Sequence, residues 1–172
     1  MKAVLALGAN LGDRAATLQT ALDGLAAQTE VVAVSAIYET APVGGPAQPD
    51  FYNAVVLVDT TLAAKDLLAV AHSLEAVAGR VRLEHWGPRT LDVDVLAYGD
   101  ERSDDPDLTL PHPRAHERAF VLLPWLEIEP DGAIVGRGTL AELAGEVGAT
   151  GVRRLDAPAL RTPRFPTAGV VT

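Results

Sequence analysis

The sequence predicts an α+β fold, a ferredoxin-like open sheet with helices packed on one face and long active-site loops. Hydrophobic residues make up 48% of the 172 residues and charged residues 22%, so the chain is expected to bury a core. Short β-branched runs and segments of helical periodicity alternate in the order β-α-β-β-α-β. Two long stretches rich in Pro, Gly and polar residues interrupt this order and are the expected functional surface.

The chain begins with a strand, a turn and a helix. Lys2–Leu7 is short and apolar, which is typical of a buried strand, and Gly8–Gly12 reads as a turn. Leucines then recur at helical spacing, which predicts an amphipathic helix over Asp13–Ala27. The Val- and Ile-rich run Val31–Tyr38 predicts the second strand.

A long loop and a second strand–helix unit follow. Ala41–Asp50 holds three Pro and two Gly and is predicted to be a loop, while Tyr52–Asp59 is β-rich. An apolar stripe with helical spacing predicts a helix that is capped by Thr61 and ends near Gly79. On its polar side, His72 and Glu75 are expected to face solvent.

The second half of the chain is more irregular. Arg80–Thr90 is polar and predicts a second long loop, and Leu91–Tyr98 predicts a strand. The acidic segment Gly99–Asp107 is expected to be exposed. Beyond it, the pattern predicts helices within Arg114–Leu126 and over Thr139–Val147, and a last strand at Val152–Leu155. We therefore expect one domain, residues 1–157, and an extended Pro-containing tail, residues 158–172.

Composition excludes several classes of function. The formal charge of −9 disfavours a nucleic-acid partner, which normally requires a basic face. The absence of Cys excludes a disulfide framework and a thiolate metal site. No apolar run approaches the roughly 20 residues of a membrane span, and no signal peptide is apparent. A cytoplasmic protein, monomeric and without a membrane partner, is the expectation.

The strongest chemical signal is the Asp pair in Leu91–Leu96. Side chains alternate along a strand, so Asp92 and Asp94 are expected on one face, about 6.6 Å apart. Two carboxylates on one rigid face suit hard cations such as Mg²⁺, and a two-metal site fits between them. The alternative is the exposed polar side of a half-buried strand.

Other candidate residues are weaker one by one. Arginines upstream of the Asp pair either bind a polyphosphate or form salt bridges with the two carboxylates. Trp86 is either a core residue or a stacking plate for a flat ligand, and Gly8–Gly12 is either a phosphate-binding or a structural turn. His112 lies in a stiff Pro-rich frame, and Arg114 and Arg118 are one helical turn apart.

Together these segments resemble a known family. Trp86-Gly87-Pro88-Arg89 followed by Thr90-Leu91-Asp92-Val93-Asp94-Val95-Leu96 closely resembles the signature of the 6-hydroxymethyl-7,8-dihydropterin pyrophosphokinases of folate biosynthesis. Further segments agree in order along residues 1–130: Leu7–Gly12, Tyr38–Gly44, Gln48–Asn53, Leu110–Pro113 and Arg118–Phe120.

The resemblance implies an ATP-dependent enzyme that transfers pyrophosphate to the hydroxymethyl group of the dihydropterin and releases AMP. It implies two Mg²⁺ ions on Asp92 and Asp94, with Arg80 and Arg89 neutralising charge on the transferred group. The implied ATP-binding residues are Leu68, His72, Arg80, Val95, Thr109, His112 and Arg118. The implied pterin-binding residues are Thr40, Pro42, Val43, Phe51, Asn53, Trp86 and Phe120, with the two phenylalanines sandwiching the ring.

Two other functions stay open on the residues alone. One is a different Mg²⁺-dependent nucleotidyl or phosphoryl transferase that uses the same Asp pair. The other is a non-catalytic ferredoxin-like module that binds a ligand. The nucleotide product distinguishes the first alternative from pyrophosphoryl transfer, because phosphoryl transfer releases ADP and pyrophosphoryl transfer releases AMP. Lack of any turnover would favour the second.

Overall fold

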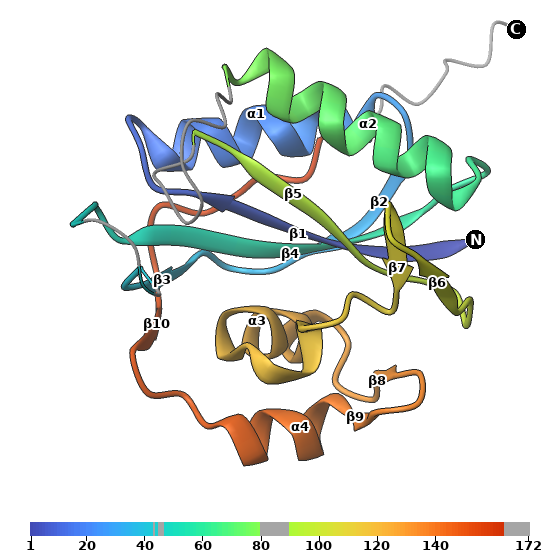
Figure 1. Cartoon of the computed structure of the whole chain (residues 1–172). Coiled ribbons are helices and arrows are strands. Elements are labelled where there is room, and N and C mark those ends of the chain that lie inside the picture. Colours follow the sequence, from blue (N-terminus) through green and yellow to red (C-terminus); the bar gives the residue numbers. More distant parts are fainter. Residues whose placement is uncertain (43, 45–46, 80–89, 164–172) are drawn as a thin grey trace, which may run out of the picture.

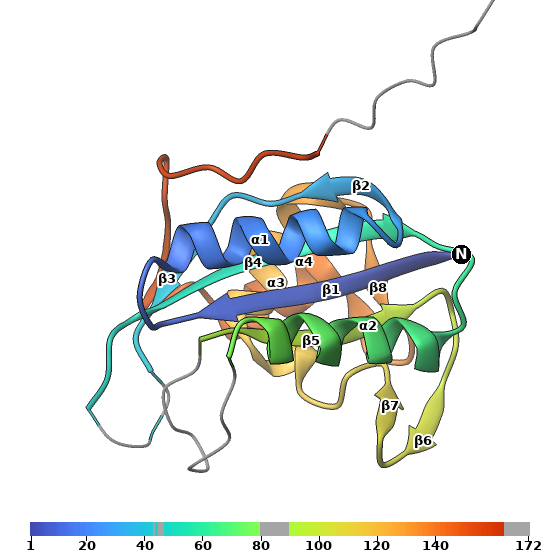
Figure 2. The ribbon, with the colours of Figure 1, turned by 90° about the horizontal axis from the view of Figure 1, so that it is seen from above.

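The protein is built in three layers, with a central sheet between two pairs of helices (Figure 1). This computed structural model describes residues 1–42, 44, 47–79 and 90–163. Helices α1 (Arg14–Ala26) and α2 (Ala64–Val77) lie side by side on one face of the sheet, as the view from above shows (Figure 2). Helix α3 (Ala119–Ile128) lies on the other face, and helix α4 (Leu140–Val147) packs against α3 on its side away from the sheet.

Six strands form the central sheet, and two small hairpins accompany it. The sheet strands are β1 (Lys2–Ala9), β2 (Glu30–Val34), β3 (Tyr38–Thr40), β4 (Phe51–Asp59), β5 (Asp92–Tyr98) and β10 (Val152–Arg154). One hairpin joins β6 (Ser103–Asp105) to β7 (Leu108–Leu110), and the other joins β8 (Ala133–Ile134) to β9 (Gly138–Thr139). A single 3-10 turn, Ala115–Glu117, precedes α3.

The topology confirms the predicted ferredoxin-like core. Strand β1 pairs with β4 on one side and with β5 on the other, and all pairs are antiparallel. Strands β2 and β3 pair with successive parts of the outer side of β4, and β10 extends the sheet beyond β3. Among the described strands, β5 pairs only with β1, so it is an edge strand of this sheet.

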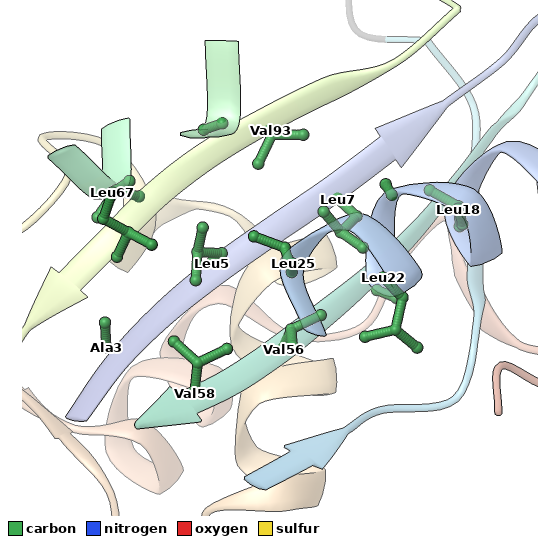
Figure 3. Packing of buried hydrophobic residues seen from close by; sticks show 14 of the residues in the cluster. Ala3, Leu5, Leu7, Leu18, Leu22, Leu25, Val56, Val58, Leu67 and Val93 are labelled. Carbon is green, nitrogen blue, oxygen red and sulfur yellow. The ribbon is translucent and has the colours of Figure 1, made fainter. Parts of the chain in front are cut away.

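Two hydrophobic clusters hold the layers together, one on each face. On the α1–α2 side, Leu18, Leu22 and Leu25 of α1 pack over Leu5 and Leu7 of β1 (Figure 3). On the other side, Trp125 of α3 is only 1% exposed and packs with residues of β1, β4 and β5. The expectation of helices on one face is therefore wrong, because α3 and α4 build a second core on the opposite face.

Two local predictions need correction. Thr61 does not cap α2; the helix starts after Ala63, which offers no side-chain hydrogen bond. The predicted strand Val31–Tyr38 is divided into β2 and β3. Between them, the Val55 amide donates to the hydroxyl of Ser35 at 2.9 Å instead of to a backbone carbonyl, while the Ser35 amide still donates to the Val55 carbonyl oxygen.

The acidic segment after β5 contains structure that its composition does not signal. It folds into the β6–β7 hairpin, which a salt bridge of 2.7 Å between Lys65 of α2 and Asp105 ties to the α1–α2 layer. The segment has few residues of high strand propensity. We therefore attribute the hairpin to the pairing of β6 with β7 and to this ion pair.

Within the described residues, no helix is long and apolar enough to cross a membrane. The first part of the predicted tail lies against α1, where the side chain of Gln19 hydrogen-bonds both backbone groups of Arg161. The division into a domain of residues 1–157 and a tail remains a prediction.

Candidate active site

Four residues from four neighbouring strands form one row across the sheet. Asp92 of β5 is opposite Gly8 of β1, Gly8 is opposite Asn53 of β4, and Asn53 is opposite Tyr38 of β3. Directly paired residues of antiparallel strands project to the same face. The row therefore places a carboxylate, a glycine gap, an amide and a phenol on one side of the sheet.

Asp92 and Asp94 share a face, as the strand period predicts. Val93 and Val95 are buried in the core beneath α1 and α2, whereas both Asp side chains are partly exposed on the opposite face. Leu96 belongs to the α3 cluster on that same face. The Asp pair therefore lies on the α3 side of the edge strand.

His112 lies beside this pair. Its Nε2 atom lies 4.0 Å from Oδ2 of Asp94, and its Nδ1 atom accepts a hydrogen bond from the Arg114 amide at 3.2 Å. Since Nδ1 is an acceptor, the proton of the neutral ring is on Nε2. Burial, followed by the positive charge of Arg118, lowers the pKa of His112 to about 4. The free protein thus presents a neutral N–H donor toward Asp94.

The low pKa of His112 predicts an acid-sensitive fold. The unfolded chain takes up the His112 proton near pH 6.5 and the native state only near pH 4, so stability falls as pH drops through this window. When the pH is lowered from 7 to 5, the free energy of unfolding should fall in both proteins. We expect this fall to be about 1–2 kcal/mol smaller in His112→Asn than in the parent protein. Urea unfolding of the ligand-free protein at both pH values measures this. His72→Asn, at an exposed position, is the control. An identical pH dependence in parent protein and His112→Asn would contradict the assignment.

Asn53 is buried and fixed in orientation. Its Nδ2 group donates to the hydroxyl of Thr40 at 3.0 Å and to the carbonyl oxygen of Tyr38 at 3.3 Å. A backbone carbonyl only accepts, so the amide nitrogen must face it. The oxygen Oδ1 is thereby directed over Gly8, where it would lie 3.4 Å from an added Cβ atom.

Two of the other predicted pterin residues, Thr40 and Phe51, lie on the same face of the sheet as Asn53. Thr40 is directly opposite Phe51, and Phe51 lies two residues from Asn53 on the same strand, so all three share a face. Pro42 is the second residue after the end of β3. Phe120 is in the first turn of α3, where the guanidinium carbon of Arg118 lies 5.6 Å from the ring centre.

The predicted ATP residues flank the open edge of β5. Leu68 and His72 are on α2, which contacts one side of the edge, and Thr109 is on β7, which also contacts β5. His112 and Arg118 lie on the other side, near the Asp pair. Val95 is only 4% exposed and belongs to the core.

Four predicted residues lie outside the described part of the chain: Val43, Arg80, Trp86 and Arg89. The Arg80–Arg89 portion of the second long loop lies outside it as well. Within the described part, no group of three or more Asp, Glu, His and Cys side chains gathers to hold a metal ion. Asp92 and Asp94 offer the hard oxygen donors that suit Mg²⁺, and ligand phosphate oxygens would complete such a site.

Asn10 of the first turn and Arg14, the first residue of α1, hold the segment that precedes β4. Asn10 is 1% exposed, and its side chain donates to Oε1 of Gln48 and to the Pro49 carbonyl oxygen. Arg14 donates to the Asp50 carbonyl oxygen at 2.7 Å and lies over the Tyr52 ring. The Gly8–Gly12 turn thus has a structural role. In the sequence, an Asn directly after an apolar strand is the signal that could have indicated this structural role.

Glu75 is the clearest error among the sequence-based expectations at this site. It does not face solvent but is only 5% exposed, and its Oε1 atom accepts a hydrogen bond from the Val93 amide at 2.9 Å. Val93 is the residue between Asp92 and Asp94. Helical periodicity shows only that a polar residue is on a given side of α2, not that an open strand edge lies beside it.

A groove of about 520 Å³ is present on the opposite side of the sheet. Residues of α1 and of the end of α2, with Thr90 and Leu91, line it. This groove is on the α1–α2 side of the sheet, whereas Asp92 and Asn53 project to the α3 side. The candidate site is therefore the α3-side surface that carries the row of paired residues, and not this groove.

Comparison with known sequences decides the family. The sequence profile of the 7,8-dihydro-6-hydroxymethylpterin-pyrophosphokinase (HPPK) family matches residues 4–130. The chain belongs to this family. The matched range contains every predicted site residue, from Thr40 to Phe120.

Curated relatives and solved structures agree. A 2-amino-4-hydroxy-6-hydroxymethyldihydropteridine pyrophosphokinase of Methylorubrum extorquens is 46% identical over 90% of this chain and 99% of its own length. The Pseudomonas aeruginosa protein of the same name is 41% identical over 88% and 94%. The crystal structure of Plasmodium falciparum HPPK-DHPS with pteroate matches with a TM-score of 0.69 at 17% identity. That match covers 89% of this chain and 46% of the longer parasite chain, and it supports the fold.

Family membership makes the chain an ATP-dependent enzyme of folate biosynthesis that transfers pyrophosphate. The predictions of family, fold and reaction are thereby confirmed. The assignment of individual residues to ATP, metal and pterin remains a proposal.

Proposed function

We propose that the row Asp92–Gly8–Asn53 is where this chain transfers the pyrophosphoryl group of ATP to 6-hydroxymethyl-7,8-dihydropterin. The observation that supports the proposal is the order of groups along the row. An amide suited to the polar edge of a flat heterocycle is separated by a glycine from a carboxylate suited to metal-bound phosphates. The acceptor hydroxyl has to lie between these two ligands, and the gap at Gly8 lies between them.

Bond changes in the reaction define what the protein must supply. The hydroxymethyl oxygen attacks the β-phosphorus, the bond from this phosphorus to the oxygen retained by AMP breaks, and the hydroxyl proton is lost. Charge neutralisation and alignment are the main requirements of such a transfer. Asp92 and Asp94 would hold two Mg²⁺ ions, which supply screening of the triphosphate charge.

The chain's own residues divide the remaining tasks. His112 presents its Nε2 proton on the Asp94 side, where it can donate to a phosphate oxygen, and Arg118 adds positive charge nearby. Arg80 and Arg89 are assigned to the transferred group by the family resemblance. Asn53 and Thr40 fix the pterin edge, while Phe51 and Phe120 stack on its faces.

Gly8→Ala is a sharp test of this arrangement. The added methyl group would lie 3.4 Å from Oδ1 of Asn53 and 4.0 Å from Cβ of Asp92, ordinary contact distances that the fold tolerates. It would, however, occupy the space proposed for the hydroxymethyl group. We expect kcat/KM for the pterin to fall by about tenfold or more, which corresponds to about 1.4 kcal/mol of transition-state stabilisation. Steady-state kinetics measures the change.

Gly145→Ala is the matched control for that variant. Gly145 lies in α4, and a Cβ atom there would meet no atom within 4 Å. Parental kinetics in both glycine variants would place the acceptor hydroxyl elsewhere.

Incubation with ATP, Mg²⁺ and the dihydropterin tests the reaction itself. AMP and the pyrophosphorylated pterin are the expected products. ADP release would indicate phosphoryl transfer, and no turnover would favour a binding module. Omission of Mg²⁺ should abolish product formation, and Mg²⁺ titration against turnover examines the number of ions.

The proposal also covers the assembly and the location of the enzyme. We infer a monomer that acts in the cytoplasm, where its co-substrate ATP is made and used, with residues 1–157 as one domain. Light scattering on the purified chain tests the monomer. Activity of a chain truncated after residue 157 tests whether the tail is needed.

A further inference from the structure

Glu75 is an unusual residue for its position in the fold. Within the described part of the chain, it is the only Asp, Glu, Lys, Arg or His among the buried residues. A buried carboxyl group is costly unless hydrogen bonds satisfy it, and an apolar residue of similar size is often at least as stabilising. Core packing alone therefore does not account for a Glu at this position of α2.

The amide that Glu75 holds belongs to the outer edge of strand β5. Of the strands that the structure describes, only β1 pairs with β5, so alternate amides of β5 point away from the sheet. The amide of Val93 is one of these, and Glu75 accepts its hydrogen bond at 2.9 Å. Helix α2 thus satisfies a donor that no described strand pairs with.

The position of this bond relates it to the reaction. Val93 is flanked by Asp92 and Asp94, and Asp92 is the first residue of β5. Strand ends open easily, whereas metal ligands must keep their geometry within about 0.5 Å. A hydrogen bond to the residue between the two ligands restrains the backbone of both.

We propose that Glu75 is a positioning residue for the Asp pair: its carboxyl group holds the Val93 amide and thereby fixes the backbone from which Asp92 and Asp94 project. This inference rests on the proposed role of the two Asp residues as metal ligands. Glu75 acts through Val93 and needs no contact with substrate.

Three variants separate the hydrogen bond from packing. Glu75→Gln keeps an acceptor oxygen of the same reach, Glu75→Leu removes the acceptor, and Leu74→Ala is the matched structural control. Leu74 is the neighbouring residue of α2, and its side chain packs against Gly24 of α1. We expect Glu75→Leu to lower kcat by about 10- to 100-fold and to raise the Mg²⁺ concentration needed for half-maximal turnover.

The controls should behave differently. Glu75→Gln should stay within about threefold of the parental kcat, because it retains the acceptor. Leu74→Ala should lose stability without a change in Mg²⁺ requirement. Equal kinetic losses in Glu75→Leu and Leu74→Ala at matched stability would overturn the proposal. A severe loss of turnover in Glu75→Gln would overturn it as well.

Hydrogen exchange of the ligand-free protein gives a readout independent of turnover. The Val93 amide should exchange slowly in the parent and in Glu75→Gln, and at least tenfold faster in Glu75→Leu. If Glu75→Leu does not fold, Glu75→Gln still decides through its kcat and its Val93 protection. Unchanged Val93 exchange in a folded Glu75→Leu would refute the inference. If the parent enzyme releases no AMP, the proposed function fails instead, and the exchange experiment still reports on the bond.

Discussion

Asp92→Ala and Asp94→Ala are each expected to lower turnover by about 10³-fold or more while the fold stays intact. Loss of one carboxylate ligand removes electrostatic stabilisation of the triphosphate, which amounts to several kcal/mol, and about 4 kcal/mol corresponds to a 10³-fold change in rate. Both side chains are partly exposed on the α3 side of β5, so their removal opens no cavity in either core. Product formation at saturating ATP and Mg²⁺ measures the effect, and circular dichroism verifies the fold.

Asp66→Ala is the matched control for the Asp pair. Asp66 is an exposed carboxylate in the first turn of α2, so its removal changes the net charge equally without touching the site. We expect parental turnover from this variant. If a folded Asp92→Ala or Asp94→Ala enzyme also keeps near-parental turnover, the two-metal assignment is wrong, and the pair is the polar face of an edge strand.

Short-range patterns predicted the parts of the site that depend on one strand. The period of two along β5 was sufficient to place Asp92 and Asp94 together and Val93 and Val95 in the core. The alternation of strand and helix likewise predicted a ferredoxin-like order of four strands. These features depend only on residues that are close in sequence. A single sequence is therefore enough to predict them.

Contacts between distant segments could not be predicted in the same way. Glu75 appeared solvated, because no property of α2 shows that the edge of β5 lies beside it. The row Asp92–Gly8–Asn53 depends on the register of three strands, and register follows from the whole sheet. The second helical layer was missed because the strand–helix order describes only one face.

Asn53→Ala is expected to weaken pterin binding by about tenfold or more and to leave ATP binding nearly unchanged. The reason is the fixed orientation of the amide. Its Nδ2 group is held by Thr40 and Tyr38, so Oδ1 is the atom available to accept from the N–H groups of a pterin edge. A buried donor left without its partner costs about 1–3 kcal/mol, and 1.4 kcal/mol is tenfold in affinity.

Phe51→Ala separates stacking from this polar contact. Phe51 shares a face with Asn53, and aromatic stacking contributes about 0.5–1.5 kcal/mol beyond buried area. Its loss should weaken pterin binding less than Asn53→Ala does. Calorimetry with the pterin and with a non-hydrolysable ATP analogue, each added separately, distinguishes the two ligands. Because the proposed ATP residues lie along the edge of β5 and Asn53 lies two strands away on β4, a local change at Asn53 should not reach the proposed ATP site. An equal loss of affinity for both ligands would mean that the pterin does not bind over β4.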